Sequence, residues 1–216
     1  MQTLKIVKTE NSQLYKWALG LAVFTIFYNI AEGLVSTYMG FEDGSLALFG
    51  FGADSFIEVI SGLGIAHMII RIQKNNSNRD NFEKTALRIT GFSFYFLVGG
   101  LIITSVYNIW TGHNPATTFI GVVISLISIV VMSALMLLKR KVGNKLNSEA
   151  ILADAACTKV CIYMSIILLV SSGIYELTHF PYIDSIGTLG LSYFAFKEGR
   201  ECFEKAKNNQ HCCKHC

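Results

Sequence analysis

One stretch decides the fold of this chain: Leu46-Ala47-Leu48-Phe49-Gly50-Phe51-Gly52-Ala53-Asp54-Ser55-Phe56-Ile57-Glu58, the start of an apolar run over residues 46–72. The run is long enough for a helix that crosses a membrane, which needs about 20 residues. Asp54 and Glu58 are four residues apart, so their side chains lie on one face of that helix. A charged side chain at the centre of a bilayer costs at least about 2.5 kcal/mol, so a pair of acids there predicts a function.

A second apolar run, residues 151–170, carries a pair of cysteines with the same spacing. It reads Asp154-Ala155-Ala156-Cys157-Thr158-Lys159-Val160-Cys161, and it places both thiols on one helical face. Counted from opposite sides of the membrane, both pairs lie about 12 and 18 Å deep in a core about 30 Å thick. Four ligands from two helices suit a tetrahedral metal ion. The sequence therefore predicts a divalent-metal site formed by Asp54, Glu58, Cys157 and Cys161.

Each pair also has a purely structural explanation. An isolated acid in a membrane can form an ion pair with another helix, and Lys159 is available for this. Cysteines inside membrane helices are commonly small packing residues. The shared spacing in the two runs favours the metal site over both explanations.

The composition indicates an integral membrane protein. The chain has 216 residues, of which 52% are hydrophobic and only 15% charged, and its mean hydropathy is +0.45. Soluble domains carry about 25% charged residues. The first apolar run, residues 14–38, exceeds the about 7–15 residues of the apolar part of a cleaved signal peptide. We therefore expect an all-α, polytopic membrane protein.

Six apolar segments predict six transmembrane helices, at residues 14–38, 46–72, 86–110, 116–138, 149–173 and 182–196. Lysines and arginines precede the first segment and follow the second, fourth and sixth, and Lys139 and Arg140 are expected in the loop after the fourth. By the positive-inside rule, both termini are cytoplasmic. Residues 1–13 are then a cytoplasmic N-terminus, 14–203 the six-helix membrane domain and 204–216 a cytoplasmic tail.

The net charge of +3 follows from this topology and requires no nucleic-acid partner. The chain contains no phosphate-binding glycine loop, no Gly-x-Ser-x-Gly elbow and no His-Glu-x-x-His signature. These absences argue against the corresponding classes of enzyme.

Other polar residues in the apolar segments have open roles. Glu32 and Asn29 lie on neighbouring turns of the first segment and are expected to line the same cavity. Asp154 shares a face with Cys157 and is expected to admit the ion or support its ligands. Asp184 opens the sixth segment and, like Glu32 and Asp154, could admit the ion or support its ligands; the alternative is that it only caps the helix. Lys159 lies about 200° around the helix from Cys157, so we expect it to pair with an acid or reach the interface.

A second group of thiols and imidazoles lies toward the C-terminus. It consists of Cys202, His211, Cys212, Cys213, His215 and Cys216. This composition suits capture of a thiophilic metal, although a flexible end with incidental cysteines is the alternative. Disulfides are not expected in a reducing cytoplasm.

Four motifs together resemble a known family. They are Gly44-Ser45-Leu46-Ala47-Leu48-Phe49-Gly50-Phe51-Gly52-Ala53-Asp54-Ser55 with Glu58, Leu152-Ala153-Asp154-Ala155 with the cysteine pair, Pro181-Tyr182-Ile183-Asp184, and Lys197-Glu198-Gly199-Arg200-Glu201. The chain resembles the cation diffusion facilitator (cation efflux) family of metal/proton antiporters from its first segment through Phe203. It looks like a short form that lacks the family's cytoplasmic C-terminal domain and its His-rich loop between the fourth and fifth helices.

The resemblance implies a transport site at the matching positions. The family's Asp-x-x-x-Asp on the second helix corresponds to Asp54 and Glu58, and its His-x-x-x-Asp on the fifth corresponds to Cys157 and Cys161. Thiolates favour softer ions such as Cd²⁺, Hg²⁺ or Cu⁺ as well as Zn²⁺, so this chain departs from the usual zinc preference. The resemblance also implies a homodimer.

These observations predict a transporter in the cell membrane, inner or plasma, that exports a soft or borderline divalent cation by alternating access. Metal binding requires thiolate, so loading should release protons and couple metal efflux to proton entry. Its expected partners are metal cations, protons and the lipid bilayer; it is not an enzyme, needs no cofactor and binds no nucleic acid.

Two other functions remain open. One is a membrane-anchored metal sensor or chaperone, which binds metal without moving it. The other is a membrane thiol oxidoreductase that uses Cys157 and Cys161. Redox pairs favour Cys-x-x-Cys spacing, and no quinone or haem motif is present, which disfavours the oxidoreductase.

Overall fold

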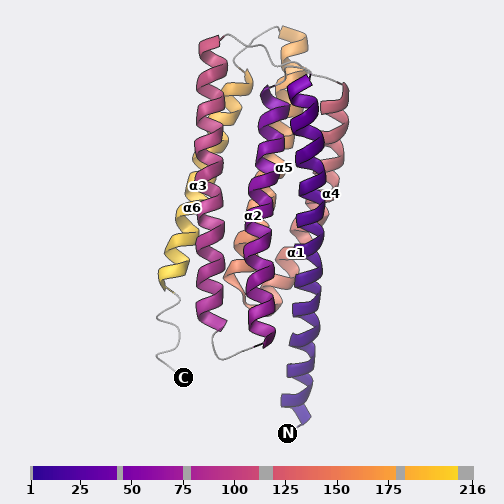
Figure 1. Cartoon of the computed structure of the whole chain (residues 1–216), viewed down its shortest axis with the longest axis vertical. Coiled ribbons are helices and arrows are strands. Elements are labelled where there is room, and N and C mark those ends of the chain that lie inside the picture. The colour runs from indigo at the N-terminus through magenta and orange to yellow at the C-terminus, as the bar shows by residue number, and fades with distance from the viewer. Residues whose placement is uncertain (1, 43–45, 75–78, 112–118, 179–182, 209–216) are drawn as a thin grey trace.

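The computed structural model describes residues 2–42, 46–74, 79–111, 119–178 and 183–208, and six α-helices account for nearly all of them. In chain order they are α1 (Gln2–Glu42), α2 (Leu46–Lys74), α3 (Arg79–Thr111), α4 (Phe119–Leu146), α5 (Glu149–Thr178) and α6 (Ile183–Asn208). Successive helices alternate in direction, so α1 begins and α6 ends at the same end of the bundle (Figure 1). The predicted all-α class is confirmed for these residues.

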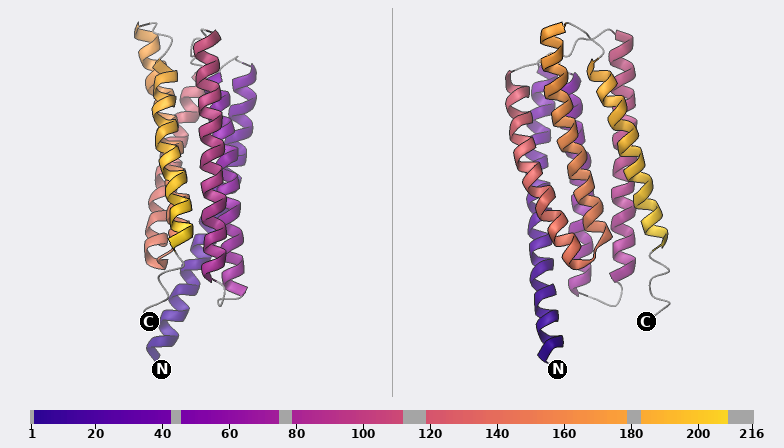
Figure 2. Two further views of the ribbon diagram at one scale, coloured as in Figure 1. Left: turned by 90° about the vertical axis from the view of Figure 1, so that its left-hand side faces the viewer. Right: turned by 180° about the vertical axis from the view of Figure 1, so that it is seen from behind.

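Helices α2 and α5 form the centre of the bundle. Helix α2 packs against α1, α3 and α5, and α5 packs against α2, α3, α4 and α6. The right-hand view of Figure 2 shows α5 between α4 and α6. In their most apolar stretches, 56% of the residues of α2 and 61% of those of α5 are buried, against 28% to 39% in α1, α3 and α4. The two helices that carry the predicted ligands are therefore the ones most shielded from the surroundings.

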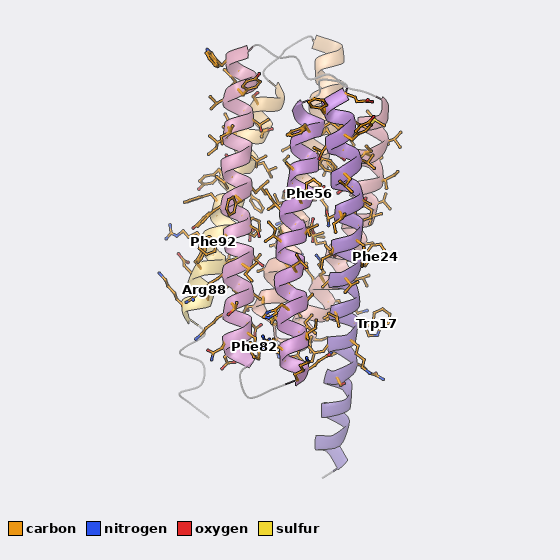
Figure 3. All side chains as sticks on the ribbon, viewed as in Figure 1. Trp17, Phe24, Phe56, Phe82, Arg88 and Phe92 are labelled. Atoms are coloured by element: carbon orange, nitrogen blue, oxygen red, sulfur yellow. The ribbon has the colours of Figure 1, made fainter. Side chains whose placement is uncertain are left out.

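The outer surface of the bundle is apolar. Figure 3 shows Trp17, Phe24 and Phe92 pointing away from the helices, and all three are more than half exposed. Polar side chains are instead buried between helices, as expected where the bundle faces lipid. Five of the six described helices contain spans long and apolar enough to cross a membrane: Ser12–Glu42, Leu48–Lys74, Asp80–Tyr107, Gly121–Leu146 and Glu149–Val170. The protein is an integral membrane protein.

The helices extend beyond the apolar segments expected from sequence. Helix α1 already begins at Gln2 instead of near residue 14, α4 continues through Leu146, and α6 continues to Asn208. Lys139 and Arg140 therefore lie inside a helix, and the prediction that they belong to a loop is wrong. Hydropathy marks only the part of a helix that suits hydrocarbon, whereas the backbone hydrogen bonds continue until a capping signal ends them.

Helix α4 ends at a tight turn that connects it to α5. Asn147 has a φ of 47°, a left-handed conformation that asparagine tolerates. The Ser148 N–H donates to the Gly143 carbonyl at 3.0 Å, and the Ser148 hydroxyl accepts from the Ile151 N–H at 3.4 Å, so one residue helps to cap both helices. Because the connection is this short, α4 and α5 are antiparallel neighbours, and Lys139 is brought alongside the start of α5.

Glycines allow α1 and α2 to pack closely. A Cβ atom built on Gly52 of α2 would lie 2.7 Å from the Thr37 backbone nitrogen and 3.0 Å from the Gly33 carbonyl oxygen, both on α1. Both neighbours are backbone atoms, so neither can move without moving the helix. Small residues at such crossings are the usual way for membrane helices to approach each other.

We therefore expect Gly52→Ala to destabilise the protein by about 1–3 kcal/mol, because the added methyl forces the two helices apart. Thermal unfolding of the purified protein in detergent measures the effect. The control is Gly20→Ala on the exposed face of α1, where a Cβ would meet nothing within 4 Å. There, the higher helix propensity of alanine should leave stability unchanged or raise it by up to about 1 kcal/mol. Equal melting temperatures for the two variants would contradict this account of the α1–α2 crossing.

Candidate metal site

The structure brings the two predicted ligand pairs to the same buried region between α2 and α5. Asp54, Glu58, Cys157 and Cys161 are 2%, 0%, 1% and 2% exposed, respectively. The Cys161 thiol donates to Glu58 Oε2 across a distance of 2.9 Å. Cys157 lies within electrostatic range of the carboxyl groups of both Glu58 and Asp54. The spacing of four residues in each helix therefore directs an acid and a thiol toward each other.

Asp54 is the acid with free lone pairs. Asp54 lies beside Cys161. The Cys161 thiol has a single proton, however, and donates it to Glu58 Oε2 at 2.9 Å. Neither carboxyl oxygen of Asp54 has a hydrogen-bond partner among the described residues, although both are buried. A buried polar group without a partner is destabilising, so its lone pairs favour an incoming cation.

The four predicted ligands are neighbours but do not form a coordination sphere. Within the described part of the chain, no group of three or more His, Cys, Asp and Glu side chains is arranged to hold a metal ion. The acid that joins the two pairs, Glu58, is instead engaged by a lysine and a threonine.

This lysine is Lys139 of α4, which the sequence analysis missed as a site residue. Its Nζ lies 2.8 Å from Asp154 Oδ2 and 3.6 Å from Glu58 Oε1, and the side chain is 2% exposed. The ammonium also donates to Thr158 Oγ1 at 2.8 Å. A buried cation between two acids neutralises charges that would otherwise be very unfavourable in a medium of low dielectric constant.

Hydroxyl groups complete this polar network. Thr158 accepts from Lys139 and donates to Glu58 Oε1, so it bridges the two charged groups. Ser61 donates to Asp154 Oδ1 at 2.9 Å and also lies 3.0 Å from the Thr90 hydroxyl of α3. The network thereby links four helices. Formally, the three acids Asp54, Glu58 and Asp154 and one ammonium carry a charge of −2, which one divalent cation balances.

Glu32 joins α1 to this region. Its two carboxyl oxygens accept from the Tyr28 and Ser55 hydroxyls, each at 3.0 Å. Ser55 is the neighbour of Asp54 in α2, so Glu32 lies close to the candidate site. Each of its carboxyl oxygens already accepts a hydrogen bond. Asn29 is also buried; its Nδ2 donates to the Thr25 carbonyl at 2.9 Å, and its Oδ1 has no partner among the described residues.

Cys202, predicted to take part in metal capture by the C-terminal cluster, lies within α6, is 3% exposed and packs into the apolar core. Burial raises the pKa of the Cys202 thiol to about 12. Helix α6 continues beyond residue 196, where the sixth apolar segment was expected to end, and Cys202 lies in this continuation. The other members of the predicted cluster lie outside the described residues: His211, Cys212, Cys213, His215 and Cys216.

Two further predicted residues lie apart from the network. Asp184 is the second residue of α6, and its side chain is outside the described part of the structure. The Lys159 ammonium lies 5.5 Å from the centre of the Tyr163 ring and 4.8 Å from that of Phe194. Aromatic faces are therefore its close partners, with the acid Glu198 of α6 within electrostatic range, and Lys139 takes the ion-pair role that the sequence suggested for Lys159.

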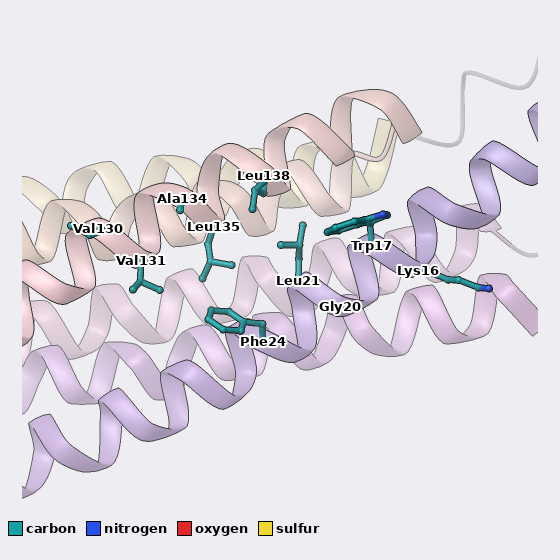
Figure 4. A pocket seen from close by; sticks show the side chains of 10 residues that line it. All are labelled: Lys16, Trp17, Gly20, Leu21, Phe24, Val130, Val131, Ala134, Leu135 and Leu138. Atoms are coloured by element: carbon teal, nitrogen blue, oxygen red, sulfur yellow. The ribbon is translucent and has the colours of Figure 1, made fainter.

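An apolar groove on the bundle is a separate feature. It has a volume of about 660 Å³, lies between α1 and α4 and is lined by apolar side chains together with Lys16 and Trp17 (Figure 4). It contains none of the acids or thiols described above. A groove of this composition suits lipid chains, so the buried network and not this groove is the candidate ion site.

Comparison with known families gives one match. The family model described as the cation efflux transmembrane domain matches residues 21–208, which include all six helices at least in part. The match confirms the resemblance inferred from the sequence motifs. No curated protein matches the chain.

The bridging role of Thr158 predicts a specific cost. Thr158→Val keeps the shape of the side chain but removes one hydrogen bond from Lys139 and one from Glu58, so we expect a loss of about 1–3 kcal/mol in stability. The matched control is Thr25→Val, because Thr25 is equally buried and its hydroxyl donates only to the Leu21 carbonyl of its own helix. Unfolding by denaturant in detergent compares the two. Similar losses for both variants would contradict the bridge.

Proposed function

The chain belongs to the cation efflux family, and from this premise we propose that it exports a soft or borderline divalent cation, such as Zn²⁺ or Cd²⁺, through Asp54, Glu58, Cys157 and Cys161. Members of this family are transporters and not enzymes, and a cation efflux transporter needs no cofactor. The observation that carries the proposal is the buried contact between Cys161 Sγ and Glu58 Oε2, at 2.9 Å, because it joins the two ligand pairs across the helix interface.

The mixed ligand set determines the proposed cargo. Thiolate sulfur binds Zn²⁺, Cd²⁺ and other soft ions strongly, while Mg²⁺ and Ca²⁺ prefer sites made of oxygen alone. Two thiols combined with two carboxylates therefore favour thiophilic ions over the abundant hard cations of the cytoplasm.

We propose that transport is coupled to protons. A metal ion that binds between Glu58 and Cys161 takes the place of the thiol proton that now lies between them. This proton leaves as the metal–sulfur bond forms, because only the thiolate is a ligand. Protons that enter from the opposite side restore the thiol and favour release of the metal, so the exchange drives efflux by alternating access.

The orientation proposed from sequence has both termini in the cytoplasm and six crossings of the cell membrane. It is supported by the alternating helix directions and by the start of α1 and the end of α6 at one end of the bundle. Residues His211 to Cys216 would then deliver metal to the site from the cytoplasm. A homodimer is proposed from the family resemblance.

Two alternative functions make different predictions for the same residues. A metal sensor or chaperone would bind the ion at this site without transporting it, and a transport assay separates the two. A thiol oxidoreductase would need Cys157 and Cys161 to form a disulfide with each other, whereas both are free thiols in the structure. The contact of Cys161 with an acid favours ligation over redox exchange.

Replacing both thiols should abolish transport. In proteoliposomes loaded with Cd²⁺, we expect Cys157→Ser combined with Cys161→Ser to reduce the efflux rate by at least about tenfold, because serine is a much weaker ligand for a soft ion. Cys202→Ser is the control: this thiol is also buried but lies outside the network, so its efflux rate should stay near that of the wild type. Wild-type efflux by the double variant would refute the assigned site.

Exchanging the thiols for the family's usual ligands should change the preferred ion. We expect Cys157→His with Cys161→Asp to retain Zn²⁺ transport and to lower the ratio of Cd²⁺ to Zn²⁺ transport by about tenfold, since imidazole and carboxylate are harder ligands than thiolate. Parallel uptake assays with the two metals measure this ratio. An unchanged ratio would show that these positions do not select the ion.

A further inference from the structure

We propose that Lys139 is an internal cation that competes with the transported metal for Glu58. The metal and the ammonium share this one carboxylate, and Asp154 retains the lysine when the metal arrives. Lys139 thereby sets the metal affinity of the site without being a ligand. This inference rests on the proposed function, since it concerns the same site.

The two ion pairs of Lys139 are unequal. Its Nζ lies 2.8 Å from Asp154 Oδ2, a direct hydrogen-bonded ion pair, but 3.6 Å from Glu58 Oε1. Between Lys139 and Glu58 lies the Thr158 hydroxyl, which accepts from the ammonium at 2.8 Å and donates to the carboxylate. Glu58 is therefore the partner that the lysine can give up, and Asp154 is the one that holds it.

Burial makes the competition strong. Lys139, Glu58 and Asp154 are all at most 2% exposed, so water screens their charges little. An ammonium this close to Glu58 attracts the carboxylate and repels a divalent cation that binds the same group. The described partners facing the ammonium are Asp154 and Thr158 of α5 and Glu58 of α2, and Cys157 also lies within its electrostatic range.

This arrangement suits a carrier that must both bind and release its cargo. Without metal, the lysine compensates two buried acids, which would otherwise be costly to keep in the bundle. With metal, Glu58 changes partner from ammonium to metal ion, and Ser61 together with Lys139 continues to satisfy Asp154. The affinity is therefore lower than that of the four ligands alone, because each binding event has to displace an attractive contact.

The test is a double-mutant cycle on metal affinity, measured by calorimetry with Cd²⁺ on the full-length protein in detergent. All variants carry serine or alanine at the cysteines and histidines of residues 211–216, so that only the buried site reports. We expect Lys139→Met to lower the Kd by about tenfold, because the competing charge is removed, and Asp154→Asn to raise it by about tenfold, because the lysine is released toward Glu58. Lys159→Met, a lysine over aromatic rings, should leave the Kd unchanged.

The combined variant, Lys139→Met with Asp154→Asn, has the same formal charge as the wild-type network. It therefore still tests the inference if the single lysine variant fails to fold. It should bind Cd²⁺ more tightly than Asp154→Asn alone. A purely structural lysine predicts the opposite sign, namely weaker binding in every variant that lacks it. Unchanged or weaker binding after loss of Lys139, in both backgrounds, would overturn the inference. A parent protein that binds no Cd²⁺ would instead contradict the proposed function itself.

Discussion

Buried charge that has to be compensated is the constraint on which this structure depends. Glu58 and Asp154 lie where α2, α4 and α5 meet, and Lys139 forms an ion pair with each of them. The geometry that allows this comes from the turn at Asn147 and Ser148, which folds α4 back along α5 so that its lysine faces the first turns of α5. Without that turn, the acids would remain unpaired in a low-dielectric interior, at a cost of several kcal/mol.

The same network explains why thiols and acids can coexist at the centre of a bundle whose outer surface is apolar. Cys161 satisfies one oxygen of Glu58, Thr158 satisfies the other, and Ser61 supports Asp154. Only Asp54 keeps both oxygens without a hydrogen bond among the described residues. The hydrogen-bonding groups of the site are thus largely satisfied by the protein itself, with one unsatisfied acid next to a thiol. This is a reasonable state for a carrier between two transport events, because it lets the helices pack without bound metal.

The sequence predicts the two pairs that the structure brings together, but not the cation beside them. The pairs could be predicted because i and i+4 positions share a face in any helix, whatever its tertiary surroundings. Lys139 could not be predicted in this way. The positive-inside rule counts a lysine near the end of an apolar segment but does not tell whether it lies in a loop or inside the bundle. One local signal was present: Asn147 is a typical helix end and Ser148 a typical helix start. Together they place the end of α4 well beyond Lys139. The hydroxyls of Ser61 and Thr158 also lie on the faces of Glu58 and Asp154, at spacings of three and four residues. The position of Cys202 inside α6 could not be predicted for the same reason, because hydropathy underestimated the length of this helix.

The central claim is that thiols of α5 and acids of α2 bind one ion together. X-ray absorption spectroscopy of the Zn²⁺-loaded protein, with the cysteines and histidines of residues 211–216 replaced, tests it most directly. The account predicts a mixed first shell, with two sulfur atoms at about 2.3 Å and oxygen atoms at about 2.0–2.2 Å. A shell without sulfur, or one of sulfur alone, would contradict it.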